Sequence, residues 1–132
     1  MIINTNLLDE ITAKAKENQR LRINYNLHES LEAPSQRLLN GMEPGTVLPI
    51  HRHENTAETY IVLRGHLIVT LYNKEHKIIE KDDLNPVCGN FGVNIPANTW
   101  HKVEVIESGT VIFECKDGPY TPLNENNMWE EK

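Results

Sequence analysis

The stretch "GTVLPIHRHENTAETYIVLRG", residues 45–65, combines strand-like apolar runs with three side chains of metal-binding type. His51 and His53 stand two positions apart, so on a strand their imidazoles point the same way. Glu58 opens the next apolar run after the short connection "ENTA". An antiparallel neighbour would bring its carboxylate to the same point. The stretch therefore predicts most of a metal site, built between two adjacent strands.

The rest of the chain indicates an all-β protein with one helix. Short runs rich in β-branched and aromatic residues, such as "HLIVTLYN", "WHKVEVIE" and "TVIFECK", are separated by turn material such as "NPVCGN" and "SG". Many closely spaced strands with no helices between them are typical of an antiparallel sandwich or barrel. Ahead of them, residues 4–19 predict a short helix with Leu7, Leu8, Ile11 and Ala15 on one face.

The length of 132 residues favours a single domain over residues 1–132. We divide it into an N-terminal helix with a polar lead-in (1–35), a barrel (36–118) and a C-terminal tail (119–132).

In the run "ETYIVLRG", Glu58, Tyr60 and Val62 share the face expected to point inward, and alternate residues between them share the other. That second face is also apolar and must be buried by packing against another element, which could be the second sheet, the helix or another subunit. The pattern thus favours a homodimer as the oligomeric state.

Composition narrows the class of partner. The net charge is −6 and the sequence pI is about 5.5, with scattered basic residues, which excludes the clustered basic surface that nucleic-acid binding needs. No apolar run is long enough to insert into a membrane, and the N-terminus lacks a secretory pattern. The cytoplasm is the expected location, and Cys88 and Cys115 are expected to be reduced thiols there.

A further ligand appears in "GVNIPANTWH", where His101 opens another strand after a proline-containing turn. Together with His51, His53 and Glu58 it gives three imidazoles and one carboxylate, a set that suits one divalent ion of Zn, Fe, Mn or Ni. Four ligands of an octahedral site leave two positions for water, oxygen or a substrate with two donor atoms.

These two segments resemble the two motifs of the cupin superfamily. Gly45, His51, His53, Glu58 and Gly65 hold the spacing of the first motif. "PANTWH" is similar to the second, with asparagine at position 98 where glycine is usual; asparagine is the non-glycine residue that best tolerates a positive φ. The resemblance implies a single cupin-type antiparallel β-barrel, or jelly roll, that binds a metal through the four ligands named above.

The segments "RLRINYNLHES", "QRLLNGMEPGT", "PIHRH", "GVNIPANTWH" and "ECKDGPY" resemble, more narrowly, the WbuC family of cupin-fold metalloproteins found among O-antigen genes. This implies a small-molecule partner that is anionic or sugar-derived, in polysaccharide metabolism. The same segments suggest further site residues. Candidates for a catalytic base are Glu114, His28 and Tyr25, and candidates for substrate binding are Arg20, Arg22, Asn26, Gln36, Arg37 and Lys116.

Three functions remain open at this stage. A Lewis-acidic metal and a nearby base would give an isomerase or epimerase acting on a sugar-derived substrate. Fe(II) at the same ligands would give a dioxygenase. The third possibility is a non-catalytic module that binds a sugar or a small acid. Fold alone cannot choose among them, because barrels of this type carry unrelated activities.

Overall fold

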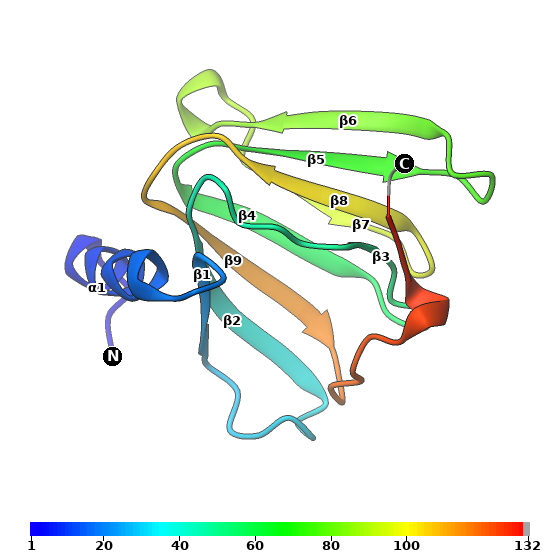
Figure 1. Ribbon diagram of the computed structural model, residues 1–132. Helices are drawn as coiled ribbons and strands as arrows, with labels where there is room; N and C mark the ends of the chain where they lie inside the picture. The colour runs from blue at the N-terminus through cyan, green and yellow to red at the C-terminus, as the bar shows by residue number, and fades with distance from the viewer. Residues whose placement is uncertain (131–132) are drawn as a thin grey trace.

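The computed structural model describes residues 1–130, so residues 131–132 of the predicted tail lie outside the described residues. The described chain forms two five-stranded antiparallel sheets that face each other, with one α-helix beside the first sheet (Figure 1). This is the jelly-roll barrel with a short N-terminal helix that the sequence predicts.

The strand order is β1-β2-β9-β4-β7 in the first sheet and β10-β3-β8-β5-β6 in the second. The helices and strands in chain order are α1 (Thr5–Glu17), β1 (Arg22–Asn26), β2 (Ser35–Met42), β3 (Ile50–His51), β4 (Glu58–Arg64), β5 (Leu67–Tyr72), β6 (Ile78–Leu84), the 3₁₀ turn η1 (Pro86–Cys88), β7 (Gly92–Ile95), β8 (Trp100–Val105), β9 (Thr110–Asp117), η2 (Glu125–Asn127) and β10 (Met128–Trp129).

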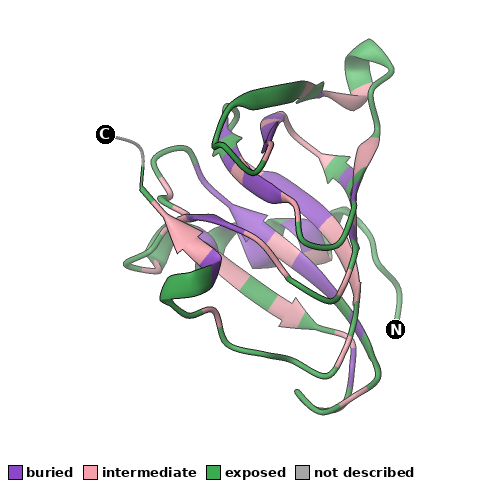
Figure 2. Cartoon of the chain, turned by 90° about the vertical axis from the view of Figure 1, so that its right-hand side faces the viewer, coloured by how far each residue is buried: buried purple, intermediate pink, exposed green. Residues whose placement is uncertain are grey.

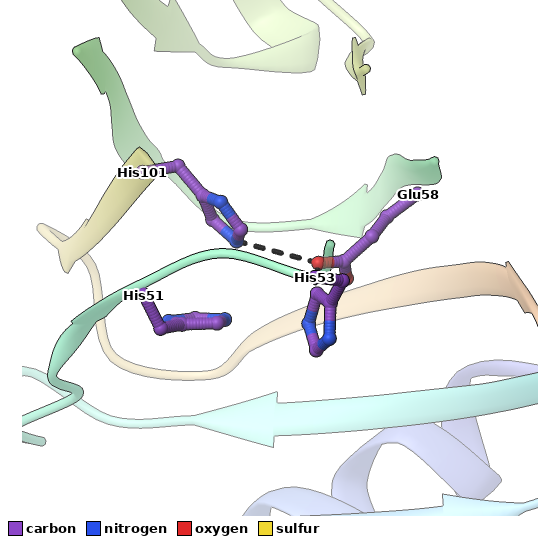
Figure 3. Close-up of side chains that lie close together, drawn as sticks. All are labelled: His51, His53, Glu58 and His101. Carbon is purple, nitrogen blue, oxygen red and sulfur yellow. Dashed lines mark ion pairs between the residues drawn. The ribbon is translucent and has the colours of Figure 1, made fainter. Parts of the chain in front are cut away.

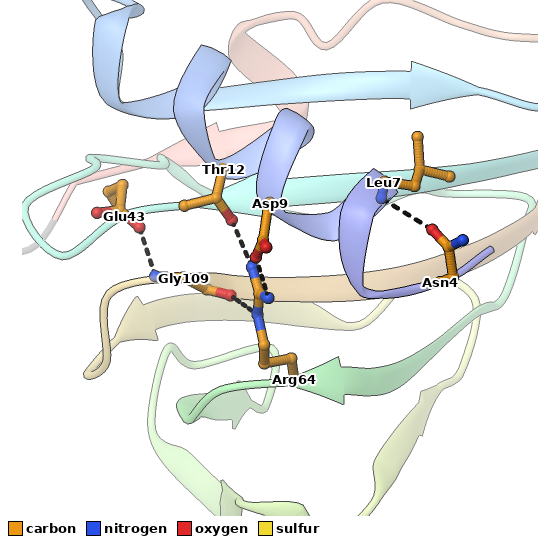
Figure 4. Close-up of polar contacts among 7 residues, drawn as sticks. All are labelled: Asn4, Leu7, Asp9, Thr12, Glu43, Arg64 and Gly109. Atoms are coloured by element: carbon orange, nitrogen blue, oxygen red, sulfur yellow. Dashed lines mark hydrogen bonds and ion pairs between the residues drawn. The ribbon is translucent and has the colours of Figure 1, made fainter.

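Helix α1 begins and packs as its sequence predicts, within two residues at each end. The Asn4 side chain accepts a hydrogen bond from the Leu7 N–H at 3.0 Å (Figure 4), which satisfies one of the free donors of the first turn. The predicted apolar face is confirmed, because Leu8, Ile11 and Ala15 are buried. This face covers the outer side of β2 and β9.

Arg64, at the end of β4, ties the helix to the barrel (Figure 4). Its guanidinium contacts the Asp9 carboxylate at 2.6 Å and donates to the Thr12 hydroxyl at 3.0 Å. The same group donates to the Gly109 carbonyl at 2.9 Å. Three acceptors from α1 and the β8–β9 turn therefore converge on one side chain, which fixes the helix against the sheet.

Residues alternate between the two faces of the first sheet, as the period of a strand requires. In β2, Leu39 points outward to the helix, whereas Leu38 lines the interior. The predicted inward face of β4 is confirmed, because Glu58, Tyr60 and Val62 are buried. Figure 2 shows the buried stretches of the chain in purple. An apolar cluster fills one part of the interior between the sheets; its members are Met42, Tyr60, Val62, Leu67, Val69, Leu71, Leu84, Ile95, Val103, Val105 and Ile112.

The outward face of β4 is only partly covered. Ile61 and Leu63 keep 41% and 39% of their surface exposed, because α1 lies over β2 and β9 and not over this part of the sheet. This exposed face leaves room for the partner subunit of the predicted homodimer, which stays a prediction.

Two segments differ from the sequence prediction. In the predicted C-terminal tail, Met128–Trp129 form β10, which pairs with β3 in the second sheet. Residues 22–26 were expected to belong to a polar lead-in before the first strand, but they form the edge strand β1, paired with β2. Ile23 and Tyr25 point toward the helix cluster, whereas Asn24 and Asn26 line a polar cavity. Because the inward residues of this strand are polar, it lacks the apolar pattern by which strands are predicted from sequence, and a loop was expected instead.

None of the helices in residues 1–130 combines the length and the apolar character needed to cross a membrane.

Candidate metal centre

The four predicted ligands meet inside the barrel (Figure 3). One donor atom from each of His51, His53, Glu58 and His101 lies within 4.8 Å of all the others. The Nε2 atoms of His53 and His101 lie 2.8 Å and 3.3 Å from Glu58 Oε1. Two donors bound to one metal at about 2.1 Å are at most about 4.2 Å apart. The group therefore needs only a small contraction to hold one ion.

The buried polar atoms of the cluster contact one another but form no hydrogen bond of good geometry. Glu58 and His101 are 2% and 1% exposed, and Glu58 Oε1 and His101 Nε2 have no hydrogen bond of good geometry with any described residue. Unpaired polar atoms at this depth are costly unless a cation joins them. Imidazole nitrogen with carboxylate oxygen is a donor set suited to a divalent transition metal, so the residues present fit such an ion.

Hydrogen bonds on the far side of two rings fix their orientation. His51 Nδ1 lies 2.9 Å from the Pro49 carbonyl, and His101 Nδ1 lies 2.9 Å from the Thr99 carbonyl. A carbonyl only accepts, so each Nδ1 carries the hydrogen and each Nε2 presents a lone pair toward the cluster. This is the arrangement by which an outer hydrogen bond orients a metal-binding histidine.

Electrostatics keep the ligands in the forms that bind metals. Burial, with a contribution from His101, lowers the pKa of His51 to about 4, so this ring is neutral at pH 7. Burial alone would raise the pKa of Glu58, but the adjacent His101 and His53 outweigh it and lower the pKa below its ordinary value. Metal binding at neutral pH therefore does not have to displace a proton from either group.

Three strands and one turn bring these side chains together. β3 pairs with β8 at His51 and His101, whose ring centres are 4.2 Å apart. On its other side β3 pairs with β10, which sets Met128 opposite His51. Asn98 has a φ of 60°, as predicted for a residue in the glycine position of the turn, and its N–H donates to the His53 carbonyl at 2.7 Å. The turn before His101 therefore also fixes the segment that carries His53.

A cavity of about 220 Å³ adjoins the metal centre between the sheets. Its wall includes His51, His53 and Glu58, and alternate inward residues of β1, β2 and β9 form much of its remaining polar lining. A volume of this size suits a small molecule rather than a polymer.

The structure brings six of the nine other candidate residues to this cavity. They are Arg22, Asn26, His28, Gln36, Glu114 and Lys116. Arg20, Tyr25 and Arg37 are not brought there. Arg20 and Arg37 are exposed, and Tyr25 packs with the apolar cluster under α1. Tyr25 and Arg37 have odd numbers on strands whose even-numbered residues point inward, which places them on the opposite face.

Other residues of the cavity wall were not singled out from the sequence. Asn24 and Asn40 face inward from β1 and β2, and Tyr120 and Thr121 reach the cavity from the segment after β9. The parity of Asn26, Gln36 and the other inward residues would have identified the two asparagines. No strand period extends to the last two, so no signal in the sequence could have found them.

Glu114 is the acidic group of the cavity beside the metal centre. Its partner across the ladder is Tyr60, which is buried next to Glu58. Burial and the negative charge of Glu58 raise the pKa of Glu114 to about 7, although Lys116 opposes the change. Burial, together with Glu58 and Glu114, also raises the pKa of Tyr60 well above its usual value. Glu114 can therefore both take up and release a proton near neutral pH.

Comparisons with known proteins agree with this fold. Residues 3–84 match the family model described as "Domain of unknown function (DUF6016)", a segment that runs from α1 through β6 and contains His51, His53 and Glu58. No curated protein matches the sequence.

Solved structures similar to this chain include cupin-fold proteins, so the chain has the cupin fold. BH2720 from Bacillus halodurans superposes with a TM-score of 0.64 at 18% identity, over 92% of this chain and 85% of that one. KdgF from Halomonas sp. gives 0.59 at 19% identity, over 76% and 82%. The capsular polysaccharide assembling protein CapF from Staphylococcus aureus gives 0.59 at 18% identity, over 69% of this chain and 25% of CapF, so this chain spans only a part of CapF.

Proposed function

The chain belongs to the family described as "Domain of unknown function (DUF6016)", and from its site we propose that it is a metal-dependent isomerase or epimerase of the WbuC type. Its substrate is a small sugar-derived molecule, and its setting is polysaccharide metabolism in the cytoplasm. One observation carries this proposal. A proton-transfer group, Glu114, lines the same cavity as the four converging metal ligands.

His51, His53, Glu58 and His101 would hold the ion, which we propose to be Zn, Fe, Mn or Ni. Such an ion supplies Lewis acidity, which polarises a carbonyl and makes the adjacent C–H bond more acidic. The carboxylate of Glu114 removes the proton from that carbon and later returns it to the same or a neighbouring carbon. A general acid–base residue works best with a pKa near the working pH, and in the metal-free chain burial and the charge of Glu58 raise the pKa of Glu114 to about 7.

The polar lining supports a substrate rich in oxygen. Asn24, Asn26 and Asn40 offer amide groups on the wall formed by β1 and β2, and Arg22 and Lys116 add positive charge. The similarity of the fold to a capsular polysaccharide assembling protein agrees with a role in polysaccharide metabolism. The exposed apolar face of β4, with Ile61 and Leu63, supports the proposal of a homodimer.

Hydrogen exchange tests the proposed reaction directly. The metal-loaded protein is incubated in D₂O with a panel of nucleotide-linked sugars and keto sugars, and NMR follows deuterium at the carbon next to the carbonyl. We expect one compound to exchange. In Glu114→Gln the rate should fall by about 100-fold or more, because general acid–base groups contribute factors of that order. Glu104→Gln, at an exposed position of β8, is the matched control and should keep the wild-type rate.

Two results would refute the proposal. One is exchange at the wild-type rate in Glu114→Gln. The other is a fully metal-loaded protein that exchanges no compound of the panel.

A further inference from the structure

A row of four inward-facing residues crosses the first sheet from the metal centre. The ladders pair Glu58 with Lys116, and Lys116 with Gln36. The Leu27 N–H donates to the Arg37 carbonyl at 2.8 Å, which continues the β1–β2 register beyond Asn26 and Leu38 and sets His28 opposite Gln36.

The row therefore reads Glu58, Lys116, Gln36, His28, and all four residues line the cavity. At about 4.8 Å per strand it spans about 14 Å between the backbones of its ends.

His28, at the far end of the row, has the opposite tautomer to the metal-binding histidines. The Arg37 N–H donates to His28 Nδ1 at 3.0 Å, so this nitrogen is an acceptor. The Arg37 carbonyl also lies 3.0 Å from Nδ1, but a hydrogen on Nδ1 would be set against the Arg37 N–H, which is fixed as a donor. The neutral ring therefore carries its hydrogen on Nε2.

The donor at Nε2 is unpaired. His28 is 7% exposed, and its Nε2 has no hydrogen-bond partner among residues 1–130. At the metal centre, beside the other end of the row, His101 Nε2 and Glu58 Oε1 lie 3.3 Å apart without a hydrogen bond of good geometry. At that end the unpaired atoms are acceptors and suit a cation. At the His28 end the unpaired atom is a donor, so it suits an acceptor such as a ligand oxygen.

Neither of the two residues between the ends of the row forms a hydrogen bond with His28 Nε2, so this donor is available to a ligand. The Gln36 amide nitrogen donates to the carbonyls of Ser30, Leu31 and Ala33, at 3.4, 3.3 and 2.9 Å, and so is used by the loop before β2. On the other side of Gln36, the Lys116 ammonium lies 5.9 Å from the centre of the Tyr120 ring, at the cavity wall. A group lying over Gln36 would have a neutral donor on one side and a cation on the other.

We propose that this end of the cavity is an anion subsite, in which a carboxylate or phosphate of the ligand lies over Gln36 and accepts hydrogen bonds from His28 Nε2 and Lys116 Nζ. The inference rests on the proposed function for the other end of the ligand, which the metal centre would hold. It names the substrate class as an acidic sugar, either a sugar acid or a sugar phosphate. His28 acts here as a hydrogen-bond donor, which replaces the role of base considered from the sequence.

Calorimetric titration of the metal-loaded full chain tests the subsite with three probes, D-glucuronate, D-glucose 6-phosphate and D-glucose. At least one of the anions should bind about 10-fold or more tightly than glucose, because hydrogen bonds to charged groups are the stronger kind. Whichever anion shows this preference identifies the group as carboxylate or phosphate. His28→Phe and Lys116→Met should each remove most of it.

Two variants serve as references. His28→Gln, which keeps a donor at a similar distance, should retain the preference within about threefold. His66→Phe, at a histidine outside the cavity that contacts Asp83, should behave as wild type. The dissociation constant for the metal should stay the same in all four variants, which separates the subsite from the metal centre.

NMR of the histidine rings tests the same inference in the wild-type protein, so its result does not depend on whether a variant folds correctly. In the wild-type protein the His28 ring should be in the Nε2–H form, and glucuronate or glucose 6-phosphate should shift its Nε2 signal. Equal affinity for all three probes, a preference that survives His28→Phe, or an Nδ1–H form of His28 would each overturn the inference.

These outcomes are distinct from those of the proposed reaction. Deuterium exchange without an anion preference removes only the subsite. An anion preference without any exchange removes only the reaction.

Discussion

The two faces of the first sheet are built from the same strands and have opposite tasks. On the outer face, Leu39 and Val111 are fully buried against the apolar side of α1. On the inner face, three residues away along each strand, Gln36 and Glu114 line a polar cavity beside the metal centre. The outer face and the apolar part of the interior stabilise the barrel by apolar burial, so the cavity end of the inner face can keep polar and charged groups that contribute little to folding. Stability and binding should therefore respond to different substitutions.

The largest effect on stability is expected at Leu39. Leu39→Ala should lower the free energy of unfolding by about 3 kcal/mol, because it leaves a cavity in a closed apolar cluster. Leu38→Ala is the matched change on the inner face. It should cost less than half as much, because Leu38 already borders open space. Urea denaturation of the metal-free proteins measures both. Equal losses would show that the two faces do not differ in this way.

A smaller effect, of opposite sign, is expected at Glu114 in the metal-free protein. Because its folded pKa is raised to about 7, the folded state keeps a proton that the unfolded state releases from about pH 4.5 upward. Stability should therefore fall as the pH rises from about 5 to 7, and then stay low. After a discount for the partial exposure of Glu114, the expected loss in the free energy of unfolding is about 2 kcal/mol.

Glu114→Gln should remove this pH dependence. The free energy of unfolding of the variant relative to wild type should therefore rise by about 2 kcal/mol between pH 5 and pH 8. Thermal and urea unfolding at several pH values in the presence of a chelator provide the test. If the free energy of unfolding of wild type and of Glu114→Gln depended on pH in the same way, the raised pKa of Glu114 would be contradicted.

The smallest effect is expected at Arg64, which joins the outer helix to the sheet. Arg64→Ala removes the contacts with Asp9, Thr12 and the Gly109 carbonyl, and should cost about 1 kcal/mol, since the group is partly exposed. Amide hydrogen exchange should rise in α1, while metal affinity remains at the wild-type level. A weaker metal affinity in this variant would mean that the helix side and the binding side are coupled.

Much of this arrangement could be predicted from local sequence. The spacing of His51, His53 and Glu58 on strands, with His101 after a tight turn, was enough to place four side chains in one group, because strand period and turn geometry are local properties. The apolar face of α1 followed from its helical period in the same way.

The features of the fold and the cavity that could not be predicted from the sequence depend on contacts between residues distant in the chain. Strand β1 has a polar face only because it borders the cavity, so its sequence does not read as a strand. Tyr120 and Thr121 reach the cavity from a segment without any period. The unpaired donor of His28 depends on the backbone of Arg37, a contact that no side-chain pattern encodes.

The most direct test of the account is the metal content of the chain purified without chelator, in wild type and in His101→Ala. Elemental analysis should find about one transition-metal ion per wild-type chain, and metal affinity in the variant should be weaker by about 100-fold or more. Both proteins should have the same circular dichroism. Unchanged metal affinity in His101→Ala, or a wild-type chain that retains no ion after exposure to Zn, Fe, Mn and Ni, would contradict the central claim that His51, His53, Glu58 and His101 bind one metal ion.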